Sequence, residues 1–506
     1  MPKSKIQPHP ESSNNFQLYN HSLSLLLDFY QLTMAYGYWK AGLDKKEAVF
    51  NLFFRRRPFQ GGFTITAGLE TVIDFLKKFH FDSSDLAYLE SLRDADNQPF
   101  FEPAFFDYLA NMKFACDIDA IPEGNVVFPY EPLIRVQGPL IQAQLLESPL
   151  LNLINFPTLI ATKAARICIA AQGDPVVEFG LRRAQGIDGS LTASRAAYIG
   201  GCEGTSNVLA GKLFGIPVRG THAHSWVMVF DDELSAFQAY ATDQPNNSVF
   251  LVDTYDTLEG VKKAIEVGLK LKQQGKKMMG IRLDSGDLAY LSIKSRAMLD
   301  EAGFTDTKII ATNELDENII RELKRQGARI DMWGVGTNLV TAGNQPALDG
   351  VYKLSALRSP GEDWHYKLKL SEQMTKVSNP GILQVKRYMA HDEYVADVIY
   401  DTAKGMTSQV AVDLFDPTKL KRINRSWKSH DLLVPIFRQG TCTYDRPSLA
   451  SIRASTQKEL SYFYSGIKRF IYPHEYVVGM EKSLHELKVN LIHTIRQQSM
   501  LEDGSQ

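Results

Sequence analysis

The feature that most constrains this 506-residue chain is a regular alternation of apolar runs and amphipathic segments between residues 175 and 345. The runs have the length of buried strands, and the segments after them carry apolar residues at helical spacing. Strands that alternate with helices form a parallel sheet, and we expect this one to close into an irregular α/β barrel. The expected strands are PVVEFG, IPVRGTHA, VFLVD, MMGIRLD, KIIATN and IDMWGVG, with helices at GSLTASRAAYIGG, TSNVLAGKLFG, 257–274, 286–302 and 316–327.

The chain on both sides of this region lacks the alternation and is expected to form a second, mixed α+β domain. Residues 22–41 are apolar nearly all round, as in a buried helix, and residues 121–144 alternate like antiparallel strands. Strand patterns and then two helical segments follow the barrel. The expected parts are a disordered N-terminal tail (1–20), an N-terminal mixed α+β segment (21–150), the catalytic α/β barrel (151–345) and a C-terminal segment that packs with the N-terminal one (346–506).

The composition excludes several classes of protein. Hydrophobic residues make up 44% of the chain and charged residues 23%, as in soluble globular proteins. The formal charge is only −2 and no basic block is present, so nucleic acid is not an expected partner. Prolines and charges interrupt the apolar stretch 145–171, so we expect buried helices rather than a membrane span. The polar N-terminus resembles no signal peptide and the four cysteines form no CxxC pair, which favours a cytoplasmic protein.

Polar residues and glycines gather where the expected barrel strands end. Catalytic residues of α/β barrels lie at the carboxyl ends of the strands, so we expect these residues to form one site. Arginines bind anions, carboxylates hold hydroxyls or support a developing cation, and backbone N–H groups bind phosphate, which together suits a phosphorylated sugar. The strand-end residues are Glu178, Arg182, Thr221, His222, His224, Asp253, Arg282, Asp284, Asn313, Gly334, Gly336 and Thr337.

Each of these residues also has a structural interpretation. An isolated aspartate at a strand end, such as Asp253, most often serves the turn that follows it. The sequence GVGTN lacks a full GxGxxG pattern, and Arg182 with Arg183 suits a solvated pair. The run GIRLDSGDL is more specific, because it places Arg282, Asp284 and further polar residues at one strand end, although Asp284 also suits a helix cap. We favour a binding or catalytic role for that run.

The pair His222 and His224 allows three interpretations. Alternate residues of a strand lie on one face, so the two rings suit a metal-dependent hydrolase. Such sites take further ligands from later strands, but the next histidine is His365, beyond the barrel, and Arg282 opposes a cation. The second interpretation is a nucleophile or general base, which we favour for His224. The third is an ordinary hydrogen-bonded side chain, which we favour for His222.

Seven motifs occur in a fixed order: DFYQLTMAYGYW, EFGLRRAQGIDG, GTSNVLAG, GTHAHSW, GIRLDSGDL, ATNELDE and GVGTNLVT. Together they resemble the nicotinate phosphoribosyltransferase family, whose catalytic domain is an irregular barrel of the type II phosphoribosyltransferases. The resemblance implies that nicotinate and phosphoribosyl diphosphate give nicotinate mononucleotide and diphosphate, the first step of NAD synthesis from nicotinate. It also implies coupled ATP hydrolysis through a phosphohistidine at the position of His224. Mg²⁺ is expected to arrive with phosphoribosyl diphosphate and ATP rather than on protein ligands.

The resemblance also assigns residues to each part of the substrates. The pyridine ring is expected between two aromatic rings, of which Tyr30 comes from the second subunit, so the site implies a homodimer. The assigned residues are Tyr30, Phe179, Arg182, Ser206, Thr221 and Arg282 for nicotinate, Gly334, Gly336, Thr337 and Asp284 for phosphoribosyl diphosphate, and His224, Arg282 and Asp284 for catalysis.

Ser206 bears on the choice between nicotinate and nicotinamide. In nicotinamide-using relatives an aspartate stands at this position of GTSN, where it accepts a hydrogen bond from an amide and repels a carboxylate. A serine removes that repulsion and donates a hydrogen bond, so the sequence predicts nicotinate. The alternatives are a nicotinamide or quinolinate phosphoribosyltransferase, a metal-dependent barrel hydrolase, and a barrel without catalytic activity.

Overall fold

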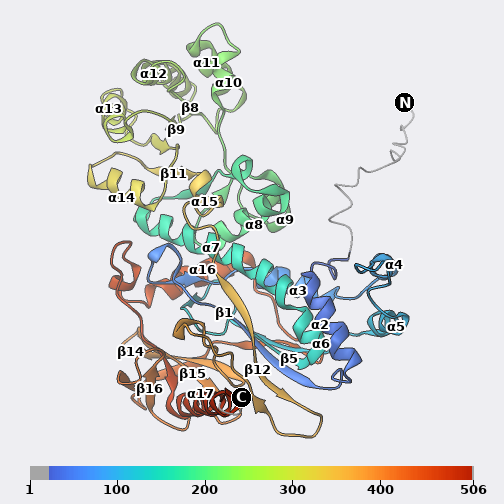
Figure 1. The fold of residues 1–506 in the computed structure, drawn as a ribbon. Helices are drawn as coiled ribbons and strands as arrows, with labels where there is room; N and C mark the ends of the chain where they lie inside the picture. The colour runs from blue at the N-terminus through green and yellow to red at the C-terminus, as the bar shows by residue number, and fades with distance from the viewer. Residues whose placement is uncertain (1–21, 504–506) are drawn as a thin grey trace.

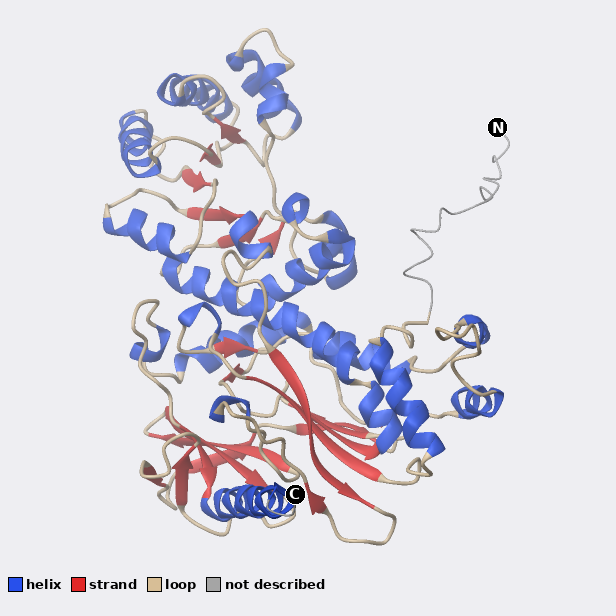
Figure 2. Cartoon of the chain, in the orientation of Figure 1, coloured by secondary structure: helices blue, strands red, loops and turns tan. Residues whose placement is uncertain are grey.

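Three large sheets organise residues 22–503, the part of the chain that the computed structural model describes. One six-stranded sheet is parallel, a seven-stranded sheet is antiparallel, and a second six-stranded sheet is mixed. The chain therefore has an α/β fold with parallel and antiparallel sheets (Figures 1 and 2). The disordered tail predicted for residues 1–20 lies outside the described residues.

The parallel sheet has the strand order β7-β6-β11-β10-β9-β8. Five of the predicted strands are confirmed as members of this sheet, and β7 is an additional short strand that the sequence did not indicate. Their apolar side chains are buried on both faces, which is why the runs lack alternation. The strands are β6 (Val176–Glu178), β7 (Gly204–Thr205), β8 (Val249–Leu251), β9 (Gly280–Leu283), β10 (Lys308–Ala311) and β11 (Met332–Val335).

Helices connect these strands; five lie close to the predicted positions, and the two between residues 224 and 243 were not predicted. Four of them begin directly after an aspartate whose carboxylate accepts from backbone N–H groups of the first turn: Asp232, Asp256, Asp287 and Asp316. This capping satisfies donors that have no partner inside the helix and fixes where each helix starts. The helices are α8 (Gly186–Ile199), α9 (Val208–Phe214), α10 (His224–Met228), α11 (Glu233–Asp243), α12 (Thr257–Gln273), α13 (Leu288–Glu301), α14 (Glu317–Arg325) and α15 (Thr337–Val340), with a short 3-10 turn η2 (Leu181–Arg183).

The strand predicted at IPVRGTHA is wrong as a regular strand. Only Val218 forms an isolated parallel bridge, to Thr205 of β7. Pro217 lacks an N–H donor, so the segment pairs only through the Pro217 carbonyl and the Arg219 N–H before it turns away. Within residues 22–503 no strand pairing joins β7 to β8, and the parallel strands form an open sheet by their backbone pairing.

The antiparallel sheet combines strands from both ends of the chain, in the order β13-β12-β1-β5-β3-β19-β20. Its inner strand β1 is rich in aromatic residues and pairs with β12 on one side and β5 on the other. The buried Asn51 of β1 donates to Ser355 Oγ of β12 over 2.8 Å. The strands are β1 (Glu47–Phe54), β3 (Asp117–Ala120), β5 (Ile134–Pro139), β12 (Gly350–Arg358), β13 (His365–Tyr366), β19 (Val434–Arg438) and β20 (Thr441–Cys442).

The mixed sheet is C-terminal and has the order β17-β16-β21-β15-β14-β18, with the last helix packed on β16 and β21 (Figure 1). A two-stranded ribbon and several helices complete the fold. These elements are β14 (Leu383–Ala390), β15 (Glu393–Asp401), β16 (Val410–Asp413), β17 (Leu420–Arg422), β18 (Lys428–Asp431), β21 (Val478–Glu481), α16 (Leu449–Ser461), α17 (Lys482–Asp503), β2 (Thr64–Ile65), β4 (Val126–Val127), α3 (Leu69–Lys77), α4 (Ser83–Ser91), α5 (Pro103–Asn111), α6 (Leu140–Leu145), η1 (Pro58–Gln60), η3 (Met374–Lys376) and η4 (Ser465–Lys468).

The long helix α7 (Glu147–Ala171) connects the two halves of the fold, passing between the parallel sheet and the antiparallel sheets in Figure 1. The stretch 140–171 is long and apolar enough to span a membrane by length and composition, but 72% of its most apolar window is buried inside the protein. The prediction of buried helices here is confirmed. Lys163 and Arg166 of α7 both form ion pairs with Glu317 at the start of α14, and these pairs connect α7 to the helices of the parallel sheet.

The helix predicted at 22–41 is shorter and more exposed than expected. It spans α2 (Phe29–Lys40) and buries Leu32 and Ala35, while Phe29, Tyr30 and Met34 are exposed. The prediction of burial on all sides is therefore wrong. An all-round apolar helix need not be buried within one chain, because an apolar face also serves contacts with a second molecule.

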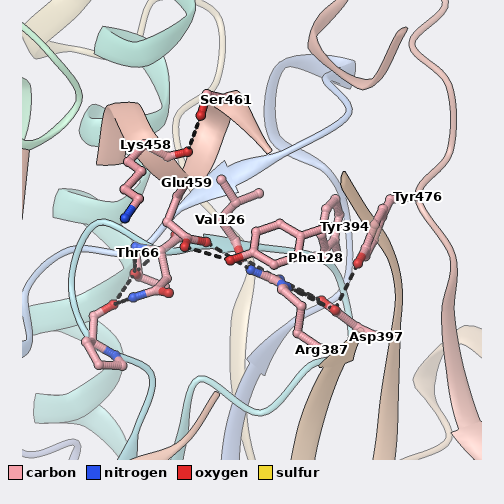
Figure 3. Close-up of polar contacts among 12 residues, drawn as sticks. Thr66, Val126, Phe128, Arg387, Tyr394, Asp397, Lys458, Glu459, Ser461 and Tyr476 are labelled. Atoms are coloured by element: carbon pink, nitrogen blue, oxygen red, sulfur yellow. Dashed lines mark hydrogen bonds and ion pairs between the residues drawn. The ribbon is translucent and has the colours of Figure 1, made fainter. Parts of the chain in front are cut away.

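A buried ionic network holds the mixed sheet against the N-terminal segment (Figure 3). The guanidinium of Arg387 pairs with both oxygens of Asp397 and donates to the Val126 carbonyl over 2.8 Å. Glu459 of α16 and the hydroxyl of Tyr476 approach from other elements. Three aromatic rings surround the cation, from Phe128, Tyr394 and Phe463.

Candidate active site

The carboxyl ends of the parallel strands carry most of the residues that the sequence assigns to a site. Parallel strands end at the same edge of a sheet, so residues that follow β6, β8, β9, β10 and β11 come together there. Phe179 follows β6, Asp253 follows β8, and Arg282 and Asp284 lie at the end of β9. Asp253, Arg282 and Asp284 interact with one another, whereas Phe179 packs against Gly334 of β11.

Arg282 is the most buried cation at this edge of the sheet. Its Nη1 donates to Thr221 Oγ1, and its buried Nε has no partner among the described residues. Burial lowers the pKa of Arg282, the carboxylates of Asp284 and Asp253 act against that, and the charge of Arg182 lowers it again. The charges of Arg182 and Arg282 repel one another, and Arg282 Nε is an unused donor. An anion that contacts both guanidinium groups would relieve the repulsion and accept from that donor.

Asp284 is held in place by its neighbours. Its Oδ1 accepts from Thr312 Oγ1, and its backbone N–H donates to Asp253 Oδ2 over 2.7 Å. The same Asp253 oxygen accepts from Ser285 Oγ over 2.8 Å, while Asp253 Oδ1 is buried and has no partner in the part of the chain that the structure describes. Asp253 thus orients the turn that carries Asp284. The sequence favoured a simple turn role for Asp253, although its place at a strand end beside the other site residues already pointed to this edge.

His224 contacts two other site residues. It is the first residue of α10, and its Nε2 lies 3.5 Å from Asp284 Oδ2. Its Nδ1 lies 3.2 Å from Thr254 Oγ1. A proton on Nε2 suits the carboxylate, which leaves the Nδ1 lone pair as the basic and nucleophilic atom. The ring is partly exposed, so a substrate can reach it.

His222 points away from His224 and has a structural role. Its side chain is only 7% exposed and contacts the Tyr240 ring edge-on at 4.8 Å. Its Nε2 accepts from the Leu251 N–H of β8 over 3.2 Å, and Nδ1 faces the Ala223 carbonyl. The preference for an ordinary hydrogen-bonded side chain fits this geometry. Among residues 22–503, no group of three or more His, Cys, Asp and Glu side chains lies close enough to hold a metal ion.

The burial of His222 predicts a pH-dependent stability. Burial lowers its pKa from 6.5 to about 4, so the unfolded chain takes up the proton first as the pH falls. Stability is therefore lost between pH 6.5 and about 4, by on the order of 3 kcal/mol for this group. Denaturant unfolding at several pH values measures it, with His222→Gln as the control, because an amide oxygen accepts the same bond without titrating. Equal pH profiles for the two proteins would contradict this account.

Phe179 and the glycines of GVGT pack together. Phe179 donates its N–H to the Val335 carbonyl over 2.8 Å, and its ring lies against Gly334. A Cβ at residue 334 would come within 2.7 Å of the Phe179 ring, so a glycine is required there for packing. Gly334 lies inside β11, whereas Gly336 precedes α15 and Thr337 begins it. The Thr337 hydroxyl donates to Glu314 Oε1 over 3.2 Å.

Tyr30 does not join the other predicted site residues. It lies on α2, where burial and then the nearby carboxylate of Glu147 raise its pKa to about 12. Glu147 is the first residue of α7, and β6 follows the other end of that helix. A helix of 25 residues is about 37 Å long, so Tyr30 and Phe179 of one chain lie far apart. Arg182 is exposed on η2, and Ser206 directly follows β7, so both remain at the edge of the parallel sheet.

The fold and this site together define an α/β enzyme whose parallel strands present arginines, carboxylates and an accessible histidine to an anionic, hydroxyl-bearing substrate. Comparison with known families makes the assignment specific. Three family models match consecutive parts of the chain: the nicotinate phosphoribosyltransferase N-terminal domain (25–155), the nicotinate phosphoribosyltransferase family (175–370) and the C-terminal domain (383–488). The chain belongs to the nicotinate phosphoribosyltransferase family, which confirms the resemblance found in the sequence.

Individual relatives match over nearly the whole chain. The nicotinate phosphoribosyltransferase of Bacillus subtilis is 44% identical over 486 residues, covering 94% of this chain and 96% of the relative. The human enzyme is 34% identical over 522 residues, with 92% and 95% covered. The crystal structure of human nicotinic acid phosphoribosyltransferase superposes with a TM-score of 0.78 at 32% identity, covering 92% of this chain and 99% of that one.

Proposed function

We propose that this chain is a nicotinate phosphoribosyltransferase, which forms nicotinate mononucleotide and diphosphate from nicotinate and phosphoribosyl diphosphate. The observation that carries the proposal is Arg282, paired with Thr221 and retaining an unused buried donor, beside the oriented carboxylate of Asp284. The relatives with this name, which match nearly the whole chain, support the same reaction. This reaction is the first step of NAD synthesis from nicotinate.

The arrangement suits the charges that the reaction creates. The bond between C1 of the ribose and the diphosphate breaks, the pyridine nitrogen bonds to C1, and the diphosphate leaves as a polyanion. Arg282 and Arg182 attract the leaving group, and Asp284 accepts hydrogen bonds from ribose hydroxyls and supports the cationic sugar. Gly336 and Thr337 are the proposed contacts for the phosphate of phosphoribosyl diphosphate, and Gly334 makes room for Phe179 beside them. Mg²⁺ bound to the substrates neutralises diphosphate charge when present.

ATP coupling is proposed to run through His224. The γ-phosphoryl group of ATP moves to the imidazole, ADP leaves, and water later cleaves the phosphohistidine to phosphate. Asp284 at Nε2 supports this role, because it favours the tautomer with the proton on Nε2, in which Nδ1 carries the lone pair that attacks when the phosphoryl group displaces the Thr254 hydroxyl. Thr254 beside Nδ1 keeps the ring in that orientation.

His224→Ala is expected to abolish the stimulation by ATP while leaving slow basal transfer, because the phosphate acceptor is lost and the substrate-binding arginines remain. Nucleotide formation is measured with and without ATP, and ³²P incorporation from γ-labelled ATP is measured on the denatured protein. His222→Gln is the matched control and should keep both properties. Full ATP coupling in His224→Ala would rule out the phosphohistidine.

Ser206→Asp is expected to raise the KM for nicotinate at least about tenfold, because the new carboxylate faces the carboxylate of the substrate. The KM for phosphoribosyl diphosphate should change much less. Steady-state kinetics measure both constants, and Ser206→Ala, which adds no charge, serves as the control. Unchanged nicotinate kinetics in Ser206→Asp would count against a role of this position in selecting the acid.

A homodimer with a shared site is part of the proposal. Tyr30 is 45% exposed beside the exposed Phe29 and Met34, and it lies far from Phe179 of its own chain. A cavity of about 460 Å³ adjoins this region and is lined by residues that include Leu26, Asp28 and Ser148. Docking of α2 on a second copy brings Tyr30 to the partner's site, where it completes the aromatic sandwich.

We also propose that the parallel strands form an irregular barrel, which residues 217–222 close. This segment bridges β7 through Val218 and reaches β8 through the hydrogen bond between Leu251 and His222, which supports a ring closed partly by a side chain. Residues 151–345 form the catalytic part in this view. Residues 21–150 and 346–506 together form the second domain, which the sheet shared by β1, β5 and β12 supports.

A cytoplasmic location fits an enzyme of nucleotide metabolism that contains four free cysteines in residues 22–503.

A further inference from the structure

Glu178, the last residue of β6, is a buried carboxylate without a cation. Its exposed fraction is 0%, and among residues 22–503 no lysine, arginine or histidine forms an ion pair with it. Its partners are neutral donors: Oε1 accepts from the Gly180 N–H, and Oε2 accepts from Ser194 Oγ over 2.8 Å and Thr205 Oγ1 over 2.5 Å. A buried charge is costly unless every oxygen is satisfied, so this arrangement tolerates little displacement.

These hydrogen bonds connect three elements behind the pyridine-binding residues. Ser194 belongs to α8 and Thr205 to β7, so one carboxylate joins β6, α8 and β7. The Asn207 side chain also donates to Ser194 Oγ, and its N–H donates to Thr205 Oγ1. The same residues therefore hold the start of α9, which Asn207 caps.

Both residues expected to contact the base lie next to these bonds. Phe179 lies between Glu178 and Gly180 in the chain. The hydrogen bond that the Gly180 N–H donates to the Glu178 carboxylate therefore spans the Phe179 backbone and restrains it. Ser206 follows Thr205 and donates its own N–H to the Glu178 carbonyl over 2.9 Å. The aromatic platform and the serine hydroxyl are thus fixed relative to each other through one residue.

We propose that Glu178 is a positioning residue for the aromatic acid substrate, acting through Phe179 and Ser206. This rests on the proposed function, since it concerns how the same site recognises a planar pyridine carboxylate. Both carboxylate oxygens of Glu178 are occupied by hydrogen bonds within the protein, so it has no role in the chemistry of this proposal. Arg282 of β9 and Asp284, which follows that strand, are held by Thr221, Asp253 and Thr312, independently of Glu178.

The test is Glu178→Gln, which keeps the size of the side chain and replaces one acceptor oxygen with a donor. The KM for nicotinate is expected to rise at least about tenfold, while the KM for phosphoribosyl diphosphate stays within about twofold. A residue that only stabilised the fold would change neither constant in the folded fraction, or both alike. Equal values of the nicotinate KM for Glu178→Gln and the parent protein would overturn the proposal.

Ser194→Ala keeps the proposal testable if Glu178→Gln does not fold. It removes one of three donors and should raise the nicotinate KM about fivefold, with an unchanged constant for phosphoribosyl diphosphate. Ser190→Ala, on the same helix and without a bond to Glu178, is the control. Nicotinate binding to the parent protein is measured by calorimetry in parallel. A parent that neither binds nicotinate nor forms nucleotide contradicts the proposed function, whereas an active parent whose Ser194→Ala form has the parental nicotinate KM contradicts only the role of Glu178.

Discussion

Arg282→Ala is expected to lower kcat/KM by about 10²- to 10³-fold, on the order of 3 kcal/mol of transition-state stabilisation. Arg282 is the most buried cation at the site edge, and its Nε has no partner among residues 22–503. Removing it leaves the departing diphosphate without its main fixed cation, and Arg182 is too exposed to replace it. Initial rates with each substrate varied in turn measure the loss.

Arg282→Lys separates charge from geometry in the same experiment. Lysine keeps the positive charge but lacks the planar fork that reaches Thr221 and an anion together, so it should recover only part of the rate. Circular dichroism and the unfolding midpoint confirm that each variant is folded. A catalytic efficiency near that of the parent in folded Arg282→Ala would refute the role of this residue and weaken the proposed function.

Arg387→Met is expected to lower the free energy of unfolding by about 3–5 kcal/mol, the largest stability effect that the structure predicts. Both Arg387 and Asp397 have 0% exposed side chains, so removal of the cation leaves a buried carboxylate unpaired. Burial and then the negative charge of Asp397 already raise the pKa of neighbouring Glu131 well above its usual range. Without Arg387, Asp397 would be a second buried acid beside Glu131 that has no cation to pair with.

Denaturant unfolding tests this prediction against two matched variants. Lys386→Met removes the adjacent, partly exposed pair with Asp431 and should cost less than about 1 kcal/mol. The double variant Arg387→Met with Asp397→Leu replaces both buried charges by apolar groups and should recover much of the loss. An effect of Arg387→Met no larger than that of Lys386→Met would show that the network in Figure 3 does not stabilise the fold.

The parallel strands and their helices could be predicted because their signals are local. Buried strands appear as apolar runs, and an aspartate marks the start of several helices, as at Asp256, Asp287 and Asp316. The segment 216–223 is not recognisable from its sequence, because its pairing depends on Pro217 and on a hydrogen bond that the Leu251 N–H of β8 donates to the His222 ring. The exposure of α2 was missed because periodicity does not distinguish the core of one chain from a face that serves another molecule.

The membership of the site was easier to predict than the role of each residue. The order of strand ends alone predicts Arg282 and Asp284 at one edge, because parallel strands end together. Thr221 lies there too, through its contact with Arg282 rather than at the end of a regular strand. Spacing does not show where a side chain points. The different roles of His222 and His224 follow from their contacts in the structure, with Leu251 and with Asp284 respectively. Glu178 shows the same limit. Its place at a strand end predicts a residue that faces the site, but its carboxylate turns inward to Ser194 and Thr205.

The most direct test of the central claim is nucleotide formation from phosphoribosyl diphosphate and Mg²⁺, with nicotinate or nicotinamide, each with and without ATP. Chromatography separates the two mononucleotides, and released diphosphate is measured as an independent product. The account predicts nicotinate mononucleotide only, formed faster when ATP is present, with one diphosphate released for each nucleotide. Product from nicotinamide at the same rate would contradict the assigned substrate, and no product from either base would contradict the proposed function itself.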